Sequence, residues 1–476
     1  MYKTLSVAAP RPMLRIAAGL CICIVLRHIS LAQTVKQVFA FSNSHSSPTP
    51  ASVTPVQGRD GNLYGTTSGL GVVQSNGTVF KATTTGKETS LHIFAGTDGA
   101  FPLAGLTLGT DGNFYGAAGS GEFDFGLIFR ISPTGTYTIL HAFSGGADGA
   151  FPVEPPIQGW DGNFYGTTGA GTGNAGTVYK FTRSGTFSTI FSFNSDNSQG
   201  TQLSAPLLQA SDGNLYGVAN IGGAANCGTI FKVSRSGVLL SEYSFPCDAG
   251  GYAPVGSLIE ASDGNFYGVT ELGGTGTECG FSSGCGTVFR MNKKGQVSIL
   301  HDFVGSKEDG ALPTGLTEGT DGNFYGSTGK GGTANGGTLF QITKSGTFAL
   351  LYSFTGPNGQ TPGAALYQDT NGEIYGTTEQ GGTYGEGTLF SLDMGLSPFL
   401  SFVVPAGRIG GQVQILGQGF IGATSVTFNG VPATSFKVVS DTYLTAVVPS
   451  GATSGKVVVT TPGGVLTSNV SFRIIQ

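Results

Sequence analysis

The chain has 476 residues, of which 81 are Gly and only 11% are charged, while aromatic residues also reach 11%. This aromatic content and a mean hydropathy of +0.11 exclude a disordered Gly-rich chain. The formal net charge is −5, and it becomes −9 without residues 1–32, which hold four basic and no acidic residues. Because nucleic-acid binding depends on basic side chains that neutralise phosphates, we expect no nucleic-acid partner.

Residues 1–32 are predicted to be a signal peptide. Three basic residues precede the apolar run Ile16–Leu26, and Ser30 and Ala32 occupy small-residue cleavage positions. The run is too short to span a membrane, and no later segment is long and apolar enough to do so. We therefore expect export, with no transmembrane segment after signal removal.

A unit of about 50 residues then recurs seven times. The steps between successive copies are 51, 50, 51, 51, 58 and 50 residues, and a fixed period of this kind indicates a repeat architecture. Each copy is recognised by a short polar turn, which begins at Asp60, Asp111, Asp161, Asp212, Asp263, Asp321 and Asn371.

Each unit contains four short β-rich stretches bounded by turn residues, such as "PLAGLTLG", "FYGTT", "GTVFK" and "ILHAF". Four-stranded units in radial repetition are typical of a β-propeller. The last unit lacks its fourth strand, while a lone strand, Val35–Phe41, precedes the first unit. Pairing the two would leave no open sheet edge. We therefore predict an all-β protein whose residues 33–396 form a seven-bladed β-propeller, with the N-terminal strand closing the last blade.

The Asp-Gly pair of each unit is predicted to be structural. It joins the first and second strands, where a two-residue hairpin requires positive φ and selects such residues. The seventh copy, at Asn371, keeps the turn but loses the carboxylate, which a cation or catalytic site would not readily tolerate. The Tyr that follows each turn is expected to pack within the blade, with its hydroxyl satisfied at an edge.

Four cysteines remain after signal removal, and an even number in an exported chain suggests disulfides. We favour Cys227–Cys247, which flank one predicted hairpin, and Cys279–Cys285, which close the loop "CGFSSGC". A zinc site is the rival interpretation, but no CxxC spacing or neighbouring His supports it.

The repeated unit "DGNFYGTT…GTVFK…SGT" resembles the Gloeobacter/Verrucomicrobia-type (GloVer) tandem repeat, over about Gln33 to Met394. The resemblance implies a bacterial, exported propeller and carries over no catalytic residue.

Residues 397–476 lack the repeat and contain about seven alternating apolar stretches, which predict a β-sandwich. The strings "LGQGF", "VTFNG" and "VVP" are similar to the IPT/TIG domain, an Ig-like fold. The resemblance implies a spacer or contact module. DNA-binding relatives use basic loops, which this segment lacks.

Function on such a scaffold is expected in its longer loops. The Asp-Gly-Asn and "SGT" turns lie on one face of the predicted propeller, here called the turn face. The second-to-third and between-blade loops lie on the other, the loop face. The candidate ligand-binding residues on the loop face are Asp98, Asp148, Asp248, Asp309, Glu122 and Glu271.

A ring of such carboxylates could hydrogen-bond sugar hydroxyls or bind calcium, the latter at Asp98, Asp148 and Asp309. The alternative is that these are solvated Asp-Gly turns. No other cofactor is expected. Loop aromatics that could stack on a sugar are Phe101, Phe123, Phe125, Phe151, Tyr252, Phe281 and Tyr384, although packing also explains Phe101 and Phe151.

No catalytic residues are predicted. His92, His141 and His301 share one repeat position that is aromatic in the other units, on outer strands that diverge from blade to blade. A shared zinc or a catalytic triad is therefore not expected. The sequence favours a secreted, cell-surface or periplasmic binding or adhesion-type protein that recognises glycan or envelope polysaccharide. The alternatives are a secreted carbohydrate-active hydrolase or lyase using loop carboxylates, and a structural module that contacts an envelope protein.

Overall fold

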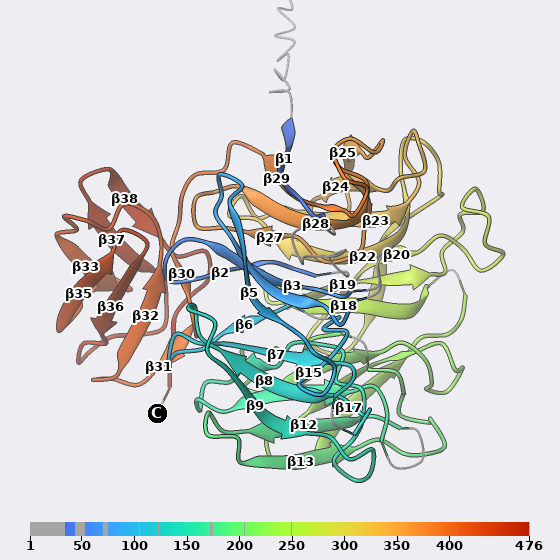
Figure 1. Ribbon diagram of the computed structural model, residues 1–476, viewed down its shortest axis with the longest axis horizontal. Helices are drawn as coiled ribbons and strands as arrows, with labels where there is room; N and C mark the ends of the chain where they lie inside the picture. Colours follow the sequence, from blue (N-terminus) through green and yellow to red (C-terminus); the bar gives the residue numbers. More distant parts are fainter. Residues whose placement is uncertain are drawn as a thin grey trace, which may run out of the picture. The chain divides into compact units, whose positions relative to one another are not determined.

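The computed structural model describes residues 34–42, 53–69, 75–103, 105–121, 123–171, 175–203, 205–248 and 250–475. The chain divides into two units, 1–32 and 33–476, and the predicted signal peptide lies outside the described residues. Every regular element in the described part is a strand (Figure 1). No helix there is long and apolar enough to cross a membrane.

Seven sheets of the repeated kind, here called blades 1 to 7, are present in the described residues. Blade 1 contains β2 (Val56–Gln57), β3 (Leu63–Thr67), β4 (Thr78–Ala82) and β5 (Glu88–Ile93). Blade 2 contains β6 (Thr107–Leu108), β7 (Phe114–Ala118), β8 (Leu127–Ile131) and β9 (Tyr137–Ala142). Blade 3 contains β10 (Ile157–Gln158), β11 (Phe164–Thr168), β12 (Thr177–Phe181) and β13 (Phe187–Ser192). Blade 4 contains β14 (Leu208–Gln209), β15 (Leu215–Ala219), β16 (Thr229–Val233) and β17 (Leu239–Ser244).

The second strand has seven residues in each of the last three blades, against five in the first four. Blade 5 contains β18 (Tyr252–Glu260), β19 (Phe266–Leu272), β20 (Thr287–Met291) and β21 (Val297–Asp302). Blade 6 contains β22 (Ala311–Glu318), β23 (Phe324–Lys330), β24 (Thr338–Ile342) and β25 (Phe348–Ser353). Blade 7 contains β26 (Gln360–Pro362), β27 (Tyr367–Gln368), β28 (Ile374–Gln380), β29 (Thr388–Asp393) and β1 (Thr34–Ala40).

The N-terminal strand closes the last blade, as predicted. β1 pairs antiparallel with β29 from Thr34 opposite Asp393 to Ala40 opposite Thr388. Blade 7 also contacts blade 1, because the Thr377 hydroxyl donates a hydrogen bond of 2.8 Å to the Val53 carbonyl. The two ends of the repeat array therefore meet, and the blades form a closed propeller.

The first five residues of the second strand are buried in every blade, which explains their composition. In blade 1 the ring of Phe80 on β4 lies across Gly65 on β3, where a side chain at position 65 would overlap it. The Gly of each "YGTT" string therefore makes room for the aromatic residue of the next strand. Tyr64 and its counterparts are among the largest fully buried side chains.

The turn between the first and second strands differs from the expected two-residue hairpin. In blade 1 the Gly58 amide donates to the Asn62 carbonyl, and the Gly61 amide donates to the Gly58 carbonyl. This leaves a three-residue loop, in which Gly61 has φ of +75° and Asp60 does not have positive φ. The Gly alone meets the left-handed requirement, as in a type I turn followed by a bulge. The backbone conformation of the turn therefore does not require Asp60, and the hydrogen bonds of its side chain explain its presence.

Both expected disulfides are present. Cys227–Cys247 joins the second-to-third loop of blade 4 to the segment that follows β17, across a sequence separation of 20 residues. Cys279–Cys285 closes a separation of 6 residues inside the second-to-third loop of blade 5.

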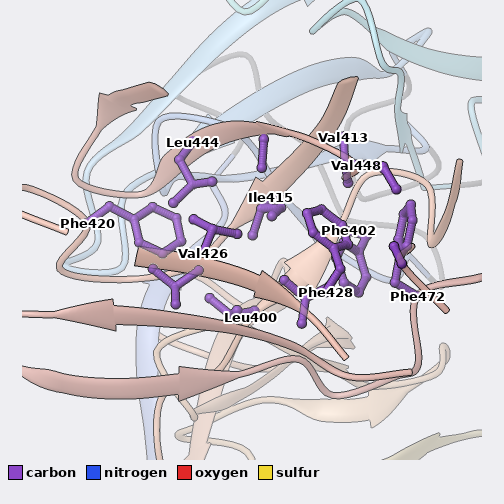
Figure 2. Close-up of a cluster of buried hydrophobic side chains, with 14 residues drawn as sticks. Leu400, Phe402, Val413, Ile415, Phe420, Val426, Phe428, Leu444, Val448 and Phe472 are labelled. Carbon is purple, nitrogen blue, oxygen red and sulfur yellow. The ribbon is translucent and has the colours of Figure 1, made fainter. Parts of the chain in front are cut away.

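Residues after the propeller form two packed sheets. One contains β30 (Ser401–Phe402), β32 (Gln412–Leu416), β36 (Tyr443–Val447) and β35 (Ser435–Ser440). The other contains β34 (Val431–Pro432), β33 (Ser425–Phe428), β37 (Val457–Thr461) and β38 (Gly464–Thr467). A short parallel pair, β31 (Ala406–Gly407) and β39 (Arg473–Ile474), completes the sandwich. Side chains from both sheets, such as Ile415, Leu444 and Val426, fill the space between them (Figure 2).

Candidate functional site

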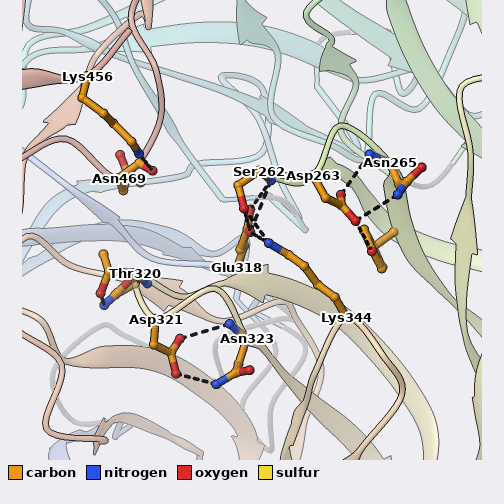
Figure 3. Close-up of polar contacts among 12 residues, drawn as sticks. Ser262, Asp263, Asn265, Glu318, Thr320, Asp321, Asn323, Lys344, Lys456 and Asn469 are labelled. Atoms are coloured by element: carbon orange, nitrogen blue, oxygen red, sulfur yellow. Dashed lines mark hydrogen bonds and ion pairs between the residues drawn. The ribbon is translucent and has the colours of Figure 1, made fainter. Parts of the chain in front are cut away.

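The turn Asp residues hold a repeated side-chain network. In blade 2 the Asp111 carboxylate accepts hydrogen bonds from the Asn113 side chain at 2.7 Å and the Tyr115 hydroxyl at 2.9 Å. In Figure 3 the same arrangement is visible for Asp263 with Asn265 and for Asp321 with Asn323. The Tyr is buried and its hydroxyl needs a partner, so the carboxylate satisfies it.

The seventh copy keeps this contact with the opposite polarity. The Asn371 side-chain amide donates to the Tyr375 hydroxyl at 3.0 Å, and the Glu373 amide donates to the Asn371 side-chain oxygen at 2.8 Å. The turn residue thus satisfies the buried Tyr of its own blade in all seven copies, and in blade 3 Asp161 also lies 3.6 Å from the Arg235 guanidinium of blade 4.

Three of the predicted ligand-binding carboxylates are bound within their own blades. Asp98 lies 3.1 Å from His92 Nε2, Asp148 lies 3.2 Å from His141 Nε2, and Asp309 lies 3.1 Å from His301 Nε2. Each also accepts a backbone amide of its own loop, from Ala95, Ser144 and Val304 respectively. The carboxylates therefore stabilise the between-blade loops at the outer strands.

Three candidates remain: Asp248, Glu122 and Glu271. The Asp248 carboxylate accepts the Gly250 amide at 2.6 Å, within its own turn. Glu122 lies outside the described residues. No group of three or more His, Cys, Asp or Glu side chains in the described part could hold a metal ion. The structure does not bring Asp98, Asp148 and Asp309 together.

The three His rings occupy blade boundaries. His92 stacks on Tyr137 with centroids 4.0 Å apart, and His141 and His301 stack in the same way on Phe187 and Phe348, at 3.7 and 4.1 Å. Burial lowers the pKa of His92 and His141, although the neighbouring Asp carboxylates favour the charged rings. Each His ring therefore packs on an aromatic ring of the next blade. This agrees with the expectation that the His residues occupy a repeat position that is aromatic in the other units.

Glu271, the sixth candidate, lies elsewhere, on the wall of a central channel. The channel is a cavity of about 830 Å³ with mainly apolar walls. Each blade contributes its inner segment, through Thr54, Leu103, Val153, Pro206, Ser257, Thr314 and Ala364. Volume and lining are those of sites that accept small organic ligands.

Besides the Tyr367 phenol, four ionisable side chains of the described residues line this channel. Glu271 and Glu379 are near the loop-face ends of β19 and β28, and Lys330 ends β23 between them. Burial raises the pKa of Glu271. The Lys330 ammonium lies 4.9 Å from the ring centroid of Phe281, in the disulfide-closed loop of blade 5. These groups give the channel mouth both hydrogen-bonding and charged character.

Glu154, the fourth, was missed by sequence reasoning. It lies in the inner segment "PVEPP" of blade 3, half-buried and facing the channel, and burial raises its pKa well above the ordinary value. The equivalent positions in the other six units hold uncharged residues: Val53, Ala104, Ala205, Gly256, Thr314 and Ala364. Aligning the seven units position by position would have exposed it as the one ionisable residue in that column.

The turn face contacts the C-terminal sandwich. The Thr442 hydroxyl donates to the Arg59 carbonyl at 2.8 Å, and the Arg59 guanidinium lies 4.6 Å from the Tyr443 ring centroid. The Arg473 guanidinium lies 5.0 Å from the ring centroid of Trp160, the one Trp of the chain. These contacts join the sandwich to the turns of blades 1 and 3.

Aromatic residues of the loop face differ in exposure. Phe123, Phe125, Phe151 and Tyr384 are exposed, Tyr384 most of all at 59%. Phe101, Tyr252 and Phe281 are half-buried. Phe101 and Phe151 have φ of 53° and 56°. The amide of each donates a hydrogen bond to a carbonyl in the second-to-third loop of the preceding blade, that of Asn76 for Phe101 and that of Phe125 for Phe151. These two residues thus tie neighbouring loops together.

Comparison with known families identifies the repeat. The model of the Gloeobacter/Verrucomicrobia repeat matches residues 25–168, 126–280 and 275–414. The chain belongs to this repeat family. The IPT/TIG domain model matches residues 398–474. No curated protein matches the chain.

Solved structures similar to this Gloeobacter/Verrucomicrobia repeat protein are distant. The "putative 6-phosphogluconolactonase" of Bacteroides uniformis ATCC 8492 is 15% identical, with a TM-score of 0.45, over 82% of this chain and 97% of that one. That of Bacteroides fragilis NCTC 9343 is 17% identical, with a TM-score of 0.43, over 80% and 93%. A "putative gluconolactonase" is 12% identical, with a TM-score of 0.39, over 77% and 94%.

Proposed function

We propose that this repeat protein is a non-enzymatic, exported bacterial binding protein that holds a glycan in the loop-face mouth of its central channel. The observation that carries the proposal is the channel itself, about 830 Å³ with apolar walls and a few carboxyl groups. Apolar sugar faces pack against such walls, while carboxylates accept hydrogen bonds from sugar hydroxyls.

The proposed binding groups agree only in part with the candidates from the loop sequences, which include Glu271 but also Asp98 and Asp148. Glu271 and Glu379 line the channel, whereas Asp98 and Asp148 are engaged by His92 and His141. The exposed ring of Tyr384 lies in the second-to-third loop of blade 7, close in sequence to Glu379. A sugar that enters the channel mouth would meet the carboxylates, and a longer glycan would extend over the exposed rings.

A second candidate is a carbohydrate-active hydrolase, and one observation favours it. Glu154 and Glu271 line the same channel, and burial raises the pKa of both. A carboxyl group that stays protonated near neutral pH is what a general acid requires. The difference between binder and enzyme is whether the glycan is shortened.

The test is affinity electrophoresis of the purified chain through gels cast with a panel of polysaccharides, with calcium or with chelator. We expect retardation in at least one gel, with no shortened sugar products. Glu271→Gln combined with Glu379→Gln should reduce retardation, and Asp98→Asn should not. Free migration through every gel would overturn the proposal and favour an envelope protein partner, while products would establish the hydrolase. Loss of retardation under chelator would show that glycan binding requires a metal ion.

A further inference from the structure

Blade 3 departs from the other blades at two positions on the same side of the channel. Tyr179 on β12 occupies a position that is Phe in the other six blades: Phe80, Phe129, Phe231, Phe289, Phe340 and Phe390. Glu154 occupies a position that holds an uncharged residue in the other six units. The two departures are coupled, because after burial the Glu154 carboxylate is the group that raises the pKa of Tyr179.

The Tyr179 hydroxyl is fully buried and has no hydrogen-bond partner. It lies across Gly166 on β11, where a side chain would overlap it, so it projects from β12 past β11 towards the inner segment that carries Glu154. The seven turn Tyr residues, by contrast, are paired with a carboxylate or an amide, as in Tyr165 with Asp161 at 2.8 Å. A buried phenol without a partner is costly, and an ionised Glu154 is the acceptor available to it.

The charge of the channel indicates what would ionise Glu154. Its described lining contains three carboxyl groups, Glu154, Glu271 and Glu379, and one ammonium group, Lys330. Lys330 lies over the Phe281 ring in the loop of blade 5. A cation bound in this apolar channel would favour the ionised form of a neighbouring carboxyl group, because an opposite charge nearby offsets the cost of burying the carboxylate.

We propose that the blade 3 wall of the channel binds the primary ammonium group of an amino sugar, with Glu154 as its counter-ion and Tyr179 as a positioning residue that donates to Glu154. This inference rests on the proposed glycan binding and names the class of glycan. An amino sugar presents apolar faces to the channel walls and an ammonium group to Glu154. Its N-acetylated counterpart has the same ring and no charge.

The experiment compares two ligands of equal length, a glucosamine tetramer and an N-acetylglucosamine tetramer, by titration calorimetry at pH 6, where the amine is charged. The variants are Glu154→Ala and Tyr179→Phe, which install residues that other blades carry at these positions and are therefore expected to fold. Glu278→Gln, which removes an exposed carboxylate of the loop face, is the matched control.

We expect the unmodified chain to bind the amine tetramer at least about tenfold more tightly than the acetylated one. Glu154→Ala should abolish this preference, and the control should keep it. Tyr179→Phe should move the pH midpoint of amine binding upwards, because the ionised Glu154 loses a donor, and a purely structural Tyr179 would leave that midpoint unchanged. Both variants should melt at or above the temperature of the unmodified chain, so lost affinity would not reflect unfolding.

Equal affinity for the two tetramers, or a preference retained in Glu154→Ala, would overturn the inference and leave glycan binding intact. If neither tetramer binds, glycan binding fails, and n-butylamine tests the ammonium site alone, because it is small enough to need only the channel. Butylamine binding that is lost in Glu154→Ala would support the ammonium site. No butylamine binding would overturn it.

Discussion

The hydroxyl of Tyr115 donates a hydrogen bond of 2.9 Å to the carboxylate of Asp111, four residues earlier in the chain. Six blades contain this Asp–Tyr pair, and blade 7 has an Asn–Tyr pair in its place. The pair joins the turn to the buried second strand of each blade. In every copy the Tyr hydroxyl has a hydrogen-bond partner, which is a carboxylate in six blades and an amide in blade 7.

Replacing Asp111 should therefore affect stability in a graded way. Asp111→Ala leaves the Tyr115 hydroxyl without a partner and should lower the free energy of unfolding by about 1–3 kcal/mol. Asp111→Asn should cost less, because Asn371 makes the equivalent contact in blade 7. Urea denaturation measures both variants. Glu308→Ala removes an exposed loop carboxylate and should change the free energy of unfolding little. Equal losses for Asp111→Ala and Asp111→Asn would contradict the idea that an amide can replace the carboxylate as the partner of the Tyr115 hydroxyl.

Acid should weaken the turn of blade 4. Burial opposes ionisation of Asp212, but hydrogen bonds from Lys232, Asn214 and Tyr216 outweigh it and lower its pKa to about 2. The unfolded chain then binds a proton more readily than the folded one, so this contribution to stability is present above about pH 4 and is lost as pH falls towards 2. Asp212→Asn should flatten the decrease of the urea midpoint between pH 4 and 2. An unchanged slope would contradict the assignment.

The His–aromatic stacks predict a second pH dependence. Burial lowers the pKa of His141 below 6.5, despite the Asp148 carboxylate. As pH falls below 6.5 the unfolded chain takes up a proton before the folded ring does, so the free energy of unfolding decreases. His141→Phe keeps an aromatic ring against Phe187. Blade 3 already carries a Phe, Phe191, at this repeat position. The variant should show a smaller change in melting temperature between pH 7 and 5, and an equal change would count against it.

The sequence predicts correctly those features of the fold that follow from the repeat period. The closing strand was recognised because Val35–Phe41 matched the strand that the last unit lacked, and the structure pairs it with β29. The disulfide of Cys227 and Cys247 followed from their flanking one hairpin. In both cases the information was the order of elements along the chain, which a fixed period determines.

The direction in which a side chain points cannot be predicted from the order of elements along the chain. The loop positions of Asp98 and its counterparts predict a shared mouth, but each carboxylate lies at hydrogen-bond distance from the His of its own outer strand, as Asp98 does from His92 Nε2 at 3.1 Å. Glu154 was overlooked because carboxylates were sought in loops, and it stands between Val153 and Pro155 in an inner segment. An inner segment faces the channel from every blade, so an ionisable residue there is more informative than one in a loop.

Removing the disulfides should have unequal effects. In the chain-entropy description, closing a loop of 20 residues stabilises by about 3 kcal/mol and one of 6 residues by about 2 kcal/mol. Replacing Cys227 and Cys247 together by Ser should therefore lower the melting temperature more than replacing Cys279 and Cys285. Mass spectrometry of peptides from the unreduced chain would check both pairings. A larger loss for the shorter loop would show that it contributes through the channel rim rather than through chain entropy.

Closure of the propeller should depend on the first described segment. Phe41 follows β1, is fully buried, and packs on Phe80 of blade 1 with ring centroids 5.2 Å apart. It therefore anchors the N-terminal segment between the last blade and the first. Phe41→Ala should lower the free energy of unfolding by about 3–5 kcal/mol through the lost burial and the cavity left behind. Phe123→Ala, at a ring that is 54% exposed, is the matched control and should leave stability nearly unchanged. Similar small losses for both would mean that the segment contributes little to closure, and hydrogen exchange of the β29 amides would then show whether β1 separates from the blade.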